Sequence, residues 1–80
     1  MEPPEGWNES GGALERELRF RDFAEALAFV NRLGELAERE NHHPDIDIRW
    51  NTVTLRFRTH SADAITERDH ALAAATNELL

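Results

Sequence analysis

A long alternating segment, DIDIRWNTVTLRFR at positions 45–58, constrains the fold more than any other part of the chain. Alternation of apolar and polar residues with a period of two is typical of β-strands that have one buried and one exposed face. We predict two antiparallel strands joined by a turn at Asn51 and Thr52. Six apolar positions would then face the core: Ile46, Ile48, Trp50, Val53, Leu55 and Phe57.

The predicted turn also defines a register for this hairpin, because loop length and turn type determine strand pairing. On the buried face it pairs apolar residues, namely Trp50 with Val53, Ile48 with Leu55 and Ile46 with Phe57. On the exposed face it pairs opposite charges, namely Asp47 with Arg56 and Asp45 with Arg58. One register therefore satisfies both faces of the predicted hairpin.

A helix is predicted over residues 22–40, directly before this hairpin. Asp22 is a favourable N-cap, and Glu25 follows three residues later, as in a capping box. Asn41 suits the C-cap, and Pro44 prevents the helix from continuing. The apolar residues of the predicted helix form one stripe: Phe23, Ala26, Leu27, Val30, Leu33, Gly34 and Ala37.

Two strands and a second helix complete the predicted elements. Residues 7–9 read as a short strand that ends at Ser10-Gly11-Gly12, and residues 13–20 alternate like a strand. Thr66 caps the last helix, with Asp69 as its third residue. The inner faces of that strand and helix would carry Leu14, Leu18, Phe20, Leu72, Ala75, Thr76 and Leu79.

The order β-β-α-β-β-α predicts an α+β fold, with a four-stranded antiparallel sheet and helices packed on one face. We expect a single domain over residues 1–80, with residues 1–6 as a loose lead-in. A chain of 80 residues has a marginal core, and without cysteine it has neither disulfides nor a thiolate metal site. Oligomerisation is therefore an expected source of stability.

Charge and hydropathy argue against several classes of protein. The formal net charge of −7 is opposite to the basic footprint of nucleic-acid binding. The apolar runs are too short to span a bilayer, and MEPPEGWNES has no feature of a signal peptide. We therefore expect a cytoplasmic protein that binds neither nucleic acid nor membrane.

Three histidines lie at the two ends of the predicted hairpin, so His42, His43 and His60 can converge. They could be surface residues that end a helix and a strand by chance. They could form a three-histidine zinc site, although adjacent histidines before a proline point in different directions. They could also perform acid–base catalysis without metal, since histidine titrates near neutral pH.

A resemblance to a known family favours the third alternative. The ordered motifs are Gly6-Trp7, Phe20-x-Asp22-Phe23, Glu38-x-x-x-His42-His43-Pro44, Trp50-Asn51-x-Val53, Thr59-His60, Thr66-Glu67-Arg68-Asp69 and Leu72-Ala73. Together they closely resemble the pterin-4a-carbinolamine dehydratases over most of the chain. The resemblance implies a four-stranded α+β fold and dehydration of 4a-hydroxytetrahydropterins to quinonoid dihydropterins, which recycles the pterin of aromatic amino acid hydroxylases. It also implies that no metal or organic cofactor is needed.

The resemblance implies a catalytic trio of His42, His43 and His60. His42 and His60 would transfer protons, and His43 would position the pterin and stabilise charge at the 4a-oxygen. Three further residues would bind substrate: Glu38, Arg68 and Asp69. Glu38 could instead be a solvated helix charge, and Asp69 an ordinary cap partner. His70 has no counterpart in the trio and is expected to be a surface residue.

The sequence also departs from the family pattern. Many relatives carry a further helix before the Gly-Trp motif, which we expect to be absent here, and have glycine in place of Ala64. The family forms dimers and tetramers, so we expect a homodimer or homotetramer. The alternative function is a non-catalytic dimerisation cofactor or assembly factor on the same fold. Degenerate members of that kind would be expected to lose histidines, and this chain keeps all three.

Overall fold

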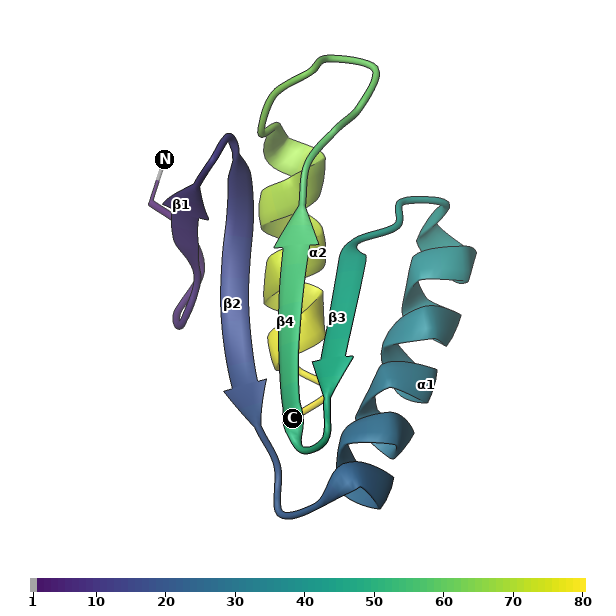
Figure 1. Cartoon of the computed structure of the whole chain (residues 1–80). Helices are drawn as coiled ribbons and strands as arrows, with labels where there is room; N and C mark the ends of the chain where they lie inside the picture. The colour runs from purple at the N-terminus through teal and green to yellow at the C-terminus, as the bar shows by residue number, and fades with distance from the viewer. Residues whose placement is uncertain (1) are drawn as a thin grey trace.

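The computed structural model describes residues 2–80, which form a four-stranded antiparallel sheet and two helices (Figure 1). In chain order the elements are β1 (Asn8–Ser10), β2 (Ala13–Arg19), α1 (Phe23–Glu40), β3 (Asp45–Arg49), β4 (Thr52–Phe57) and α2 (Glu67–Asn77). The strand order in the sheet is β1-β2-β4-β3. The predicted α+β class and the predicted order of elements are confirmed. Met1, part of the expected loose lead-in, lies outside the described residues.

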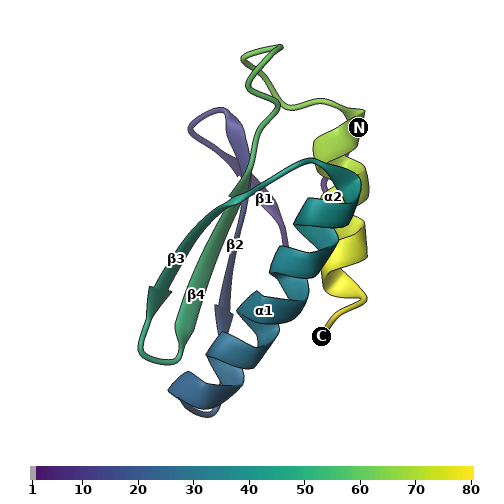
Figure 2. The same cartoon turned by 90° about the vertical axis from the view of Figure 1, so that its right-hand side faces the viewer.

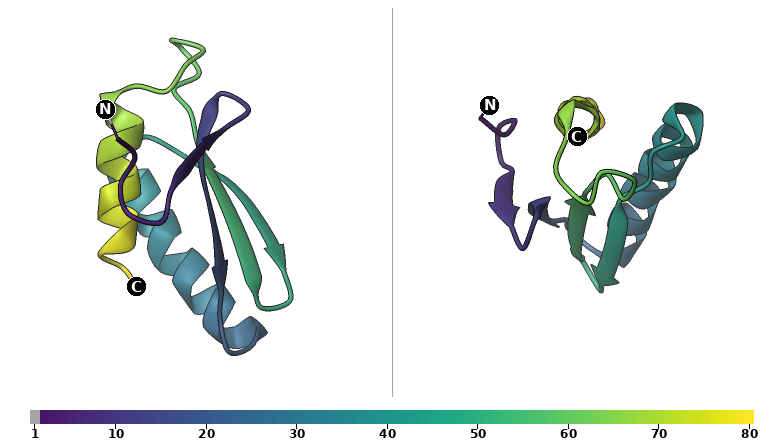
Figure 3. Two further views of the ribbon diagram at one scale, coloured as in Figure 1. Left: turned by 90° about the vertical axis from the view of Figure 1, so that its left-hand side faces the viewer. Right: turned by 90° about the horizontal axis from the view of Figure 1, so that it is seen from above.

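Both helices pack on the same face of the sheet and leave its other face uncovered (Figures 2 and 3). The core between these layers is apolar, because the alternating strands direct one set of side chains toward the helices. Its fully buried large side chains are Leu14, Phe29, Leu33, Val53, Leu55 and Phe57. No helix within residues 2–80 is long and apolar enough to cross a membrane.

The helix boundaries agree with the capping signals in the sequence. The Asp22 carboxylate accepts a hydrogen bond from the Glu25 N–H at 2.9 Å, and Asn41 ends α1 in the left-handed conformation, with φ of 51°. Thr66 and Asp69 form the capping box that begins α2. These boundaries were predictable because each depends on residues that are close in sequence.

The buried face of α1 differs from the predicted stripe. Ala26, Leu33 and Ala37 are buried as predicted, whereas Phe23 and Leu27 are 46% and 41% exposed. Phe29 and Leu36 take their place in the core. Apolar residues cover a broad arc of this helix, so periodicity alone does not select the part of the arc that meets the sheet.

The predicted register of the β3–β4 hairpin was wrong by two residues. Ile46 lies opposite Leu55, Ile48 opposite Val53, and Asp45 opposite Arg56. The turn is therefore at Trp50 and Asn51, and Ile46 and Trp50 are 40% and 67% exposed rather than buried. A shift by two residues keeps every side chain on its own face, so alternation did not exclude it.

Contacts of Asn51 with β2 account for the observed turn. Its side-chain amide donates a hydrogen bond to the Phe20 carbonyl at 2.8 Å, and its backbone carbonyl accepts one from the Phe20 N–H at 2.8 Å. These two hydrogen bonds attach the tip of the hairpin to the end of β2. They involve residues far apart in sequence, which is why the local pattern did not reveal them.

Candidate active site

A cavity of about 340 Å³ lies where α1 ends, β3 begins and β4 leads into α2. The two ends of the hairpin meet at this point, so residues from three segments converge there (Figure 1). The cavity is lined by Asn41, His42, His43, Pro44, Asp45, Thr59, His60, Ser61 and Arg68. The structure thus brings the three predicted catalytic histidines together, and Arg68 with them.

His42 is held from behind by a buried carboxylate. Its Nε2 lies 2.6 Å from Asp69 Oδ1, and the two side chains are 8% and 0% exposed. The imidazole also stacks on the Phe57 ring, with ring centroids 5.9 Å apart and an interplanar angle of 9°. His42 is therefore a buried residue at the base of the cavity, and not a surface residue as in the first of the three alternatives.

Asp69 connects His42 to the start of α2. Its Oδ2 accepts hydrogen bonds from the Thr66 N–H at 2.8 Å and from the Thr59 hydroxyl at 2.9 Å. Burial alone would raise the pKa of the Asp69 carboxyl, but the hydrogen bonds from His42, Thr66 and Thr59 together hold that pKa below its ordinary value. Asp69 is therefore both the cap partner of α2 and the partner of His42.

The contact with Asp69 defines which nitrogen of His42 can exchange a proton. An ionised carboxylate only accepts hydrogen bonds, so Nε2 of His42 must carry the hydrogen that lies between the two groups. Within the part of the chain that the structure describes, no hydrogen-bond partner is found for Nδ1. In neutral His42, Nδ1 is therefore the free proton acceptor, as in sites where a carboxylate orients a catalytic histidine.

His43 and His60 are more exposed than His42. His43 Nε2 lies 2.5 Å from Glu38 Oε2, one turn back on α1, and the side chains are 53% and 78% exposed. Glu38 therefore contacts a histidine while its own side chain stays largely exposed to solvent. His60 Nδ1 lies 3.3 Å from an Arg58 guanidinium nitrogen. Because arginine only donates, neutral His60 carries its hydrogen on Nε2.

Arg68 lines the cavity, but its observed contacts are with the backbone. Its Nη2 donates to the carbonyls of Asn41 at 3.0 Å and of Glu40 at 3.3 Å, directly before His42. Cationic side chains near the end of a helix satisfy carbonyls that lack a helical partner. Arg68 thus connects α2 to the loop that carries His42 and His43.

The loop after His60 is closed by a bridge between Thr59 and Ala64. The Thr59 N–H donates to the Ala64 carbonyl at 3.0 Å. The left-handed conformation in this loop occurs at Asp63, with φ of 51°, and Ala64 is not among the residues with positive φ. Ala64 therefore needs none of the left-handed freedom of the glycine that the family resemblance led us to compare with it.

Two residues of the site were not predicted. Phe57 supports His42 by stacking, and Thr59 donates to Asp69. Thr59 also lies 2.6 Å from the Thr66 hydroxyl. The sequence did contain a signal for Thr59, which directly precedes His60. Successive side chains of a strand point to opposite faces, so Thr59 would point inward if His60 points outward. His70 lies outside this cavity and is half-buried.

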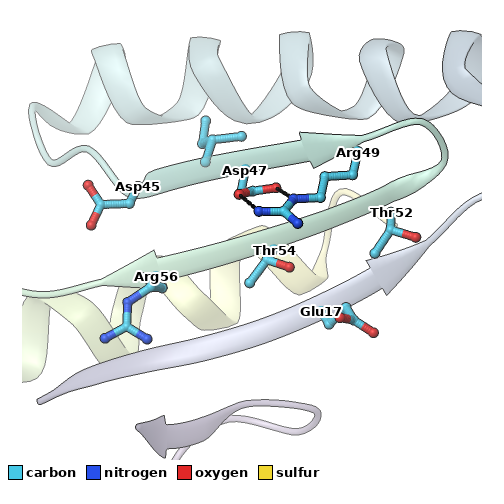
Figure 4. Close-up of a pocket in the computed structure, with 8 residues that line it drawn as sticks. Glu17, Asp45, Asp47, Arg49, Thr52, Thr54 and Arg56 are labelled. Carbon is cyan, nitrogen blue, oxygen red and sulfur yellow. Dashed lines mark hydrogen bonds and ion pairs between the residues drawn. The ribbon is translucent and has the colours of Figure 1, made fainter. Parts of the chain in front are cut away.

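A larger, open groove of about 640 Å³ lies on the uncovered face of the sheet (Figure 4). No histidine is among its lining residues, and two of its charged groups, Arg49 and Asp47, pair with each other at 3.1 Å. We assign the candidate active site to the smaller cavity, because it has the groups that can exchange protons near neutral pH.

The lowered pKa of Asp69 predicts a specific loss of stability in acid. The pKa is lower in the folded state than the usual value of about 3.9, so the unfolded chain binds more protons as the pH falls. The carboxylate therefore stabilises the fold above about pH 4 and loses this effect as the pH falls through the folded-state pKa. In urea titrations, Asp69→Asn should flatten the acid side of the stability profile. An unchanged acid slope in this variant would contradict the assignment.

Comparisons with known proteins agree with this fold. The family model described as Pterin 4 alpha carbinolamine dehydratase matches residues 1–79. A Thermomicrobium roseum protein named "Putative pterin-4-alpha-carbinolamine dehydratase" is 57% identical over 74 residues, covering 92% of this chain and 80% of the relative. A protein of the same name from Mycolicibacterium smegmatis is 47% identical over 75 residues, covering 94% and 80%.

Two solved structures share the fold. The crystal structure of a transcriptional coactivator/pterin dehydratase from Brucella melitensis has a TM-score of 0.89 at 31% identity, covering 94% of this chain and 82% of that chain. A pterin dehydratase-like protein identified as a RuBisCO assembly factor in the alpha-carboxysome has a TM-score of 0.80 at 25% identity, covering 95% and 90%. The fold and site define a small α+β protein with a histidine-lined cavity at one end of its sheet. This chain belongs to the pterin-4-alpha-carbinolamine dehydratase family.

Proposed function

We propose that this protein dehydrates 4a-hydroxytetrahydropterins to quinonoid dihydropterins by histidine acid–base catalysis. The observation that carries the proposal is the shared cavity of His42, His43 and His60, with His42 oriented by the buried Asp69. The cavity volume of about 340 Å³ lies in the range of small-molecule sites. The product would return to the pterin pool that aromatic amino acid hydroxylases use.

The reaction needs two proton transfers at adjacent atoms. The bond between C4a and the hydroxyl oxygen breaks, a proton reaches that oxygen, and water leaves. The neighbouring ring nitrogen loses its proton, and its electron pair forms the new C=N double bond. One group must therefore donate a proton, and another must accept one.

We assign the acceptor role to His42, whose Nδ1 is free because Nε2 contacts Asp69. His60, in its protonated form, would donate from Nε2 to the leaving oxygen, since Nδ1 is the nitrogen that faces Arg58. His43, beside Glu38, would hold the pterin ring and stabilise charge at the 4a-oxygen. In this proposal Asp69 and Arg68 position the histidines, while Glu38 binds either His43 or a pterin N–H.

Stopped-flow absorbance of 4a-hydroxytetrahydropterin decay tests the proposal directly. The decay rate should rise in proportion to protein concentration above the uncatalysed rate. A folded protein that gives no acceleration at any concentration would contradict the proposal. It would favour the alternative of a non-catalytic assembly or dimerisation factor.

We expect dehydration to be independent of metal ions. Within residues 2–80, no group of three or more His, Cys, Asp or Glu side chains is arranged to hold a metal. His42 and His43 also each direct Nε2 at a carboxylate instead of at a common point. Dialysis against a chelator should leave the rate unchanged. Stoichiometric zinc in protein made without a histidine tag, together with activity lost on chelation, would reverse this conclusion.

A further inference from the structure

The histidine cavity and the open groove on the sheet share one residue. Asp45 lines both of them, and the other side chains that line the groove come from β2, β3 and β4 (Figure 4). Asp45 directly follows His43 and Pro44 and begins β3, so the chain passes from the cavity to the sheet at this point. A ligand in the cavity that extends past Asp45 therefore enters the groove.

Three polar side chains of the groove are available to a ligand. Asp45 and Glu17 are exposed, and within residues 2–80 their carboxylates have no hydrogen-bond or ion-pair partner. The same holds for the hydroxyl of Thr54, which lies directly opposite Glu17 on β2 and diagonal to Asp45 on β3. Diagonal neighbours on one face of a sheet are about 7–8 Å apart. The three free groups thus form a line that begins at the cavity.

The arginines of the groove are already engaged. Arg49 pairs with Asp47 at 3.1 Å, and Arg56 pairs with Glu15 and donates to the Ser10 carbonyl at 2.9 Å. The free groups are therefore two carboxylates, which only accept hydrogen bonds when ionised, and a hydroxyl, which can also donate. Such a set suits a neutral ligand that has many hydroxyl groups. An anionic ligand would meet two unpaired carboxylates, and a cationic one would lie beside both arginines.

We propose that the ligand of the histidine cavity carries a hydroxyl-rich substituent of the size of a sugar ring, and that the groove binds this substituent. The sugar hydroxyls would donate to Asp45 where the cavity ends, and would exchange hydrogen bonds with Thr54 and Glu17 beyond it. With the pterin ring in the cavity, the substrate class is a glycosylated pterin. The identity of the ring rests on the proposed function, whereas the selectivity of the groove rests on its own free groups.

The separation of the free groups determines the size of the substituent. A hydroxymethyl group has a single hydroxyl and reaches only the first of the three groups, Asp45. A sugar ring carries several hydroxyls that point in different directions, so it can contact Asp45 and Thr54 together across about 7–8 Å. The groove has room for such a ring, since its volume is about 640 Å³, beside about 340 Å³ for the cavity.

Fluorescence titration with oxidised pterins tests the proposal without any turnover. The two probes are hydroxymethylpterin and its glucoside, which differ only in the sugar. The glucoside should bind with a Kd about tenfold lower, the effect of one hydrogen bond to a charged group. Equal affinity for the two probes would overturn the inference and leave the proposed function intact, and binding of neither would overturn both. Preference for the glucoside in a protein that catalyses no dehydration would contradict only the proposed function.

Substitutions in the groove test which groups make the contact. Asp45→Asn removes the charge and keeps the shape, and Thr54→Val removes the hydroxyl. Each should reduce the preference for the glucoside by about threefold or more, and the double variant should abolish it. A folded double variant that keeps the full preference would overturn the assignment. Because Asp45 is exposed, Asp45→Asn alone provides the same test should Thr54→Val unfold the chain.

The matched control for these substitutions is Glu35→Gln. It removes a charge from an exposed position of α1, and Glu35 lines neither the cavity nor the groove. Its preference for the glucoside should equal that of wild type. A loss of preference in Glu35→Gln as large as in Asp45→Asn would show that net charge, and not contact with the sugar, sets the affinity, and would overturn the inference.

A third probe tests the chemical class of the substituent. Pteroylglutamate has a substituent that carries carboxylates, so it should bind no more tightly than hydroxymethylpterin, because Asp45 and Glu17 repel it. Tighter binding of pteroylglutamate than of the glucoside would overturn the assignment of a neutral, hydroxyl-rich group. In stopped-flow assays, the glycosylated substrate should have a KM about tenfold lower than the hydroxymethyl substrate at unchanged kcat, since the groove contacts no bond that changes. An equal KM for the two substrates would contradict the inference.

Discussion

Replacing His42 with glutamine is expected to lower kcat for 4a-hydroxytetrahydropterin dehydration by about 10²–10⁴-fold, the usual contribution of one positioned acid–base group. Glutamine fills much of the same space but cannot take up a proton at the position of Nδ1. His60→Ala should cause a loss in the same range, because it removes the second proton-transfer group. Stopped-flow absorbance, corrected for uncatalysed decay, measures both effects.

The matched control is His70→Gln, since His70 lies outside the cavity. Its rate should stay within about twofold of wild type, a difference too small to indicate a lost acid–base group. Circular dichroism should show folded protein for all three variants. Activity within twofold of wild type in both His42→Gln and His60→Ala would contradict the acid–base assignment. Unfolding of His42→Gln would show that its contacts with Asp69 and Phe57 are chiefly structural.

Replacing Asp69 with alanine is expected to lower the free energy of unfolding by about 3–5 kcal/mol, because each buried group left without its hydrogen-bond partner costs about 1–3 kcal/mol. The carboxylate is fully buried and accepts hydrogen bonds from His42, Thr59 and the Thr66 N–H. Alanine leaves all three groups without this acceptor and removes half of the capping box of α2. Such a loss is comparable to the whole stability of many small domains, about 5 kcal/mol at the low end. Urea denaturation monitored by circular dichroism measures it.

Two comparisons separate the causes of this loss. Asp63→Asn removes an exposed charge that pairs with Arg58 and keeps a residue that tolerates the left-handed backbone at this position, so it should change the free energy of unfolding by less than about 1 kcal/mol. Asp69→Asn keeps the shape and the Thr66 contact but removes the charge, so it should fall between wild type and Asp69→Ala. It should still lose activity, because an amide can no longer be the obligate acceptor for His42. Wild-type stability of Asp69→Ala would show that the buried network contributes little.

The local features of this fold were predictable because local contacts produce them. Asp22, Asn41, Thr66 and the alternation over residues 45–58 each act on backbone groups a few positions away. Those signals correctly predicted the order of elements, both N-caps and the antiparallel class of the sheet. The resemblance to the dehydratases supplied the histidine trio, which residue types alone left open among three alternatives.

The packing of these elements was not predictable from the same signals. A two-residue shift in the β3–β4 register preserves the alternation, whereas the hydrogen bonds between Asn51 and Phe20 are long-range contacts of the observed register. A rotation of α1 keeps its period, and only contact with the sheet decides that Phe29 is buried and Phe23 exposed. In both cases the alternative arrangements have the same pattern of apolar and polar residues, so the pattern cannot distinguish them.

The candidate site shows the same division. The strand pattern and Pro44 specify the ends of one hairpin, so the positions of the three histidines at those ends follow from the amino-acid order. The burial of His42 against Phe57 and the contact of its Nε2 with the Asp69 carboxylate at 2.6 Å depend on long-range packing. These contacts join the end of α1, the end of β4 and the start of α2, so they exist only after the sheet and both helices have packed. Because Asp69 is buried, water cannot replace a lost hydrogen-bond partner of its carboxylate. The loss of any one of these partners is therefore costly in free energy.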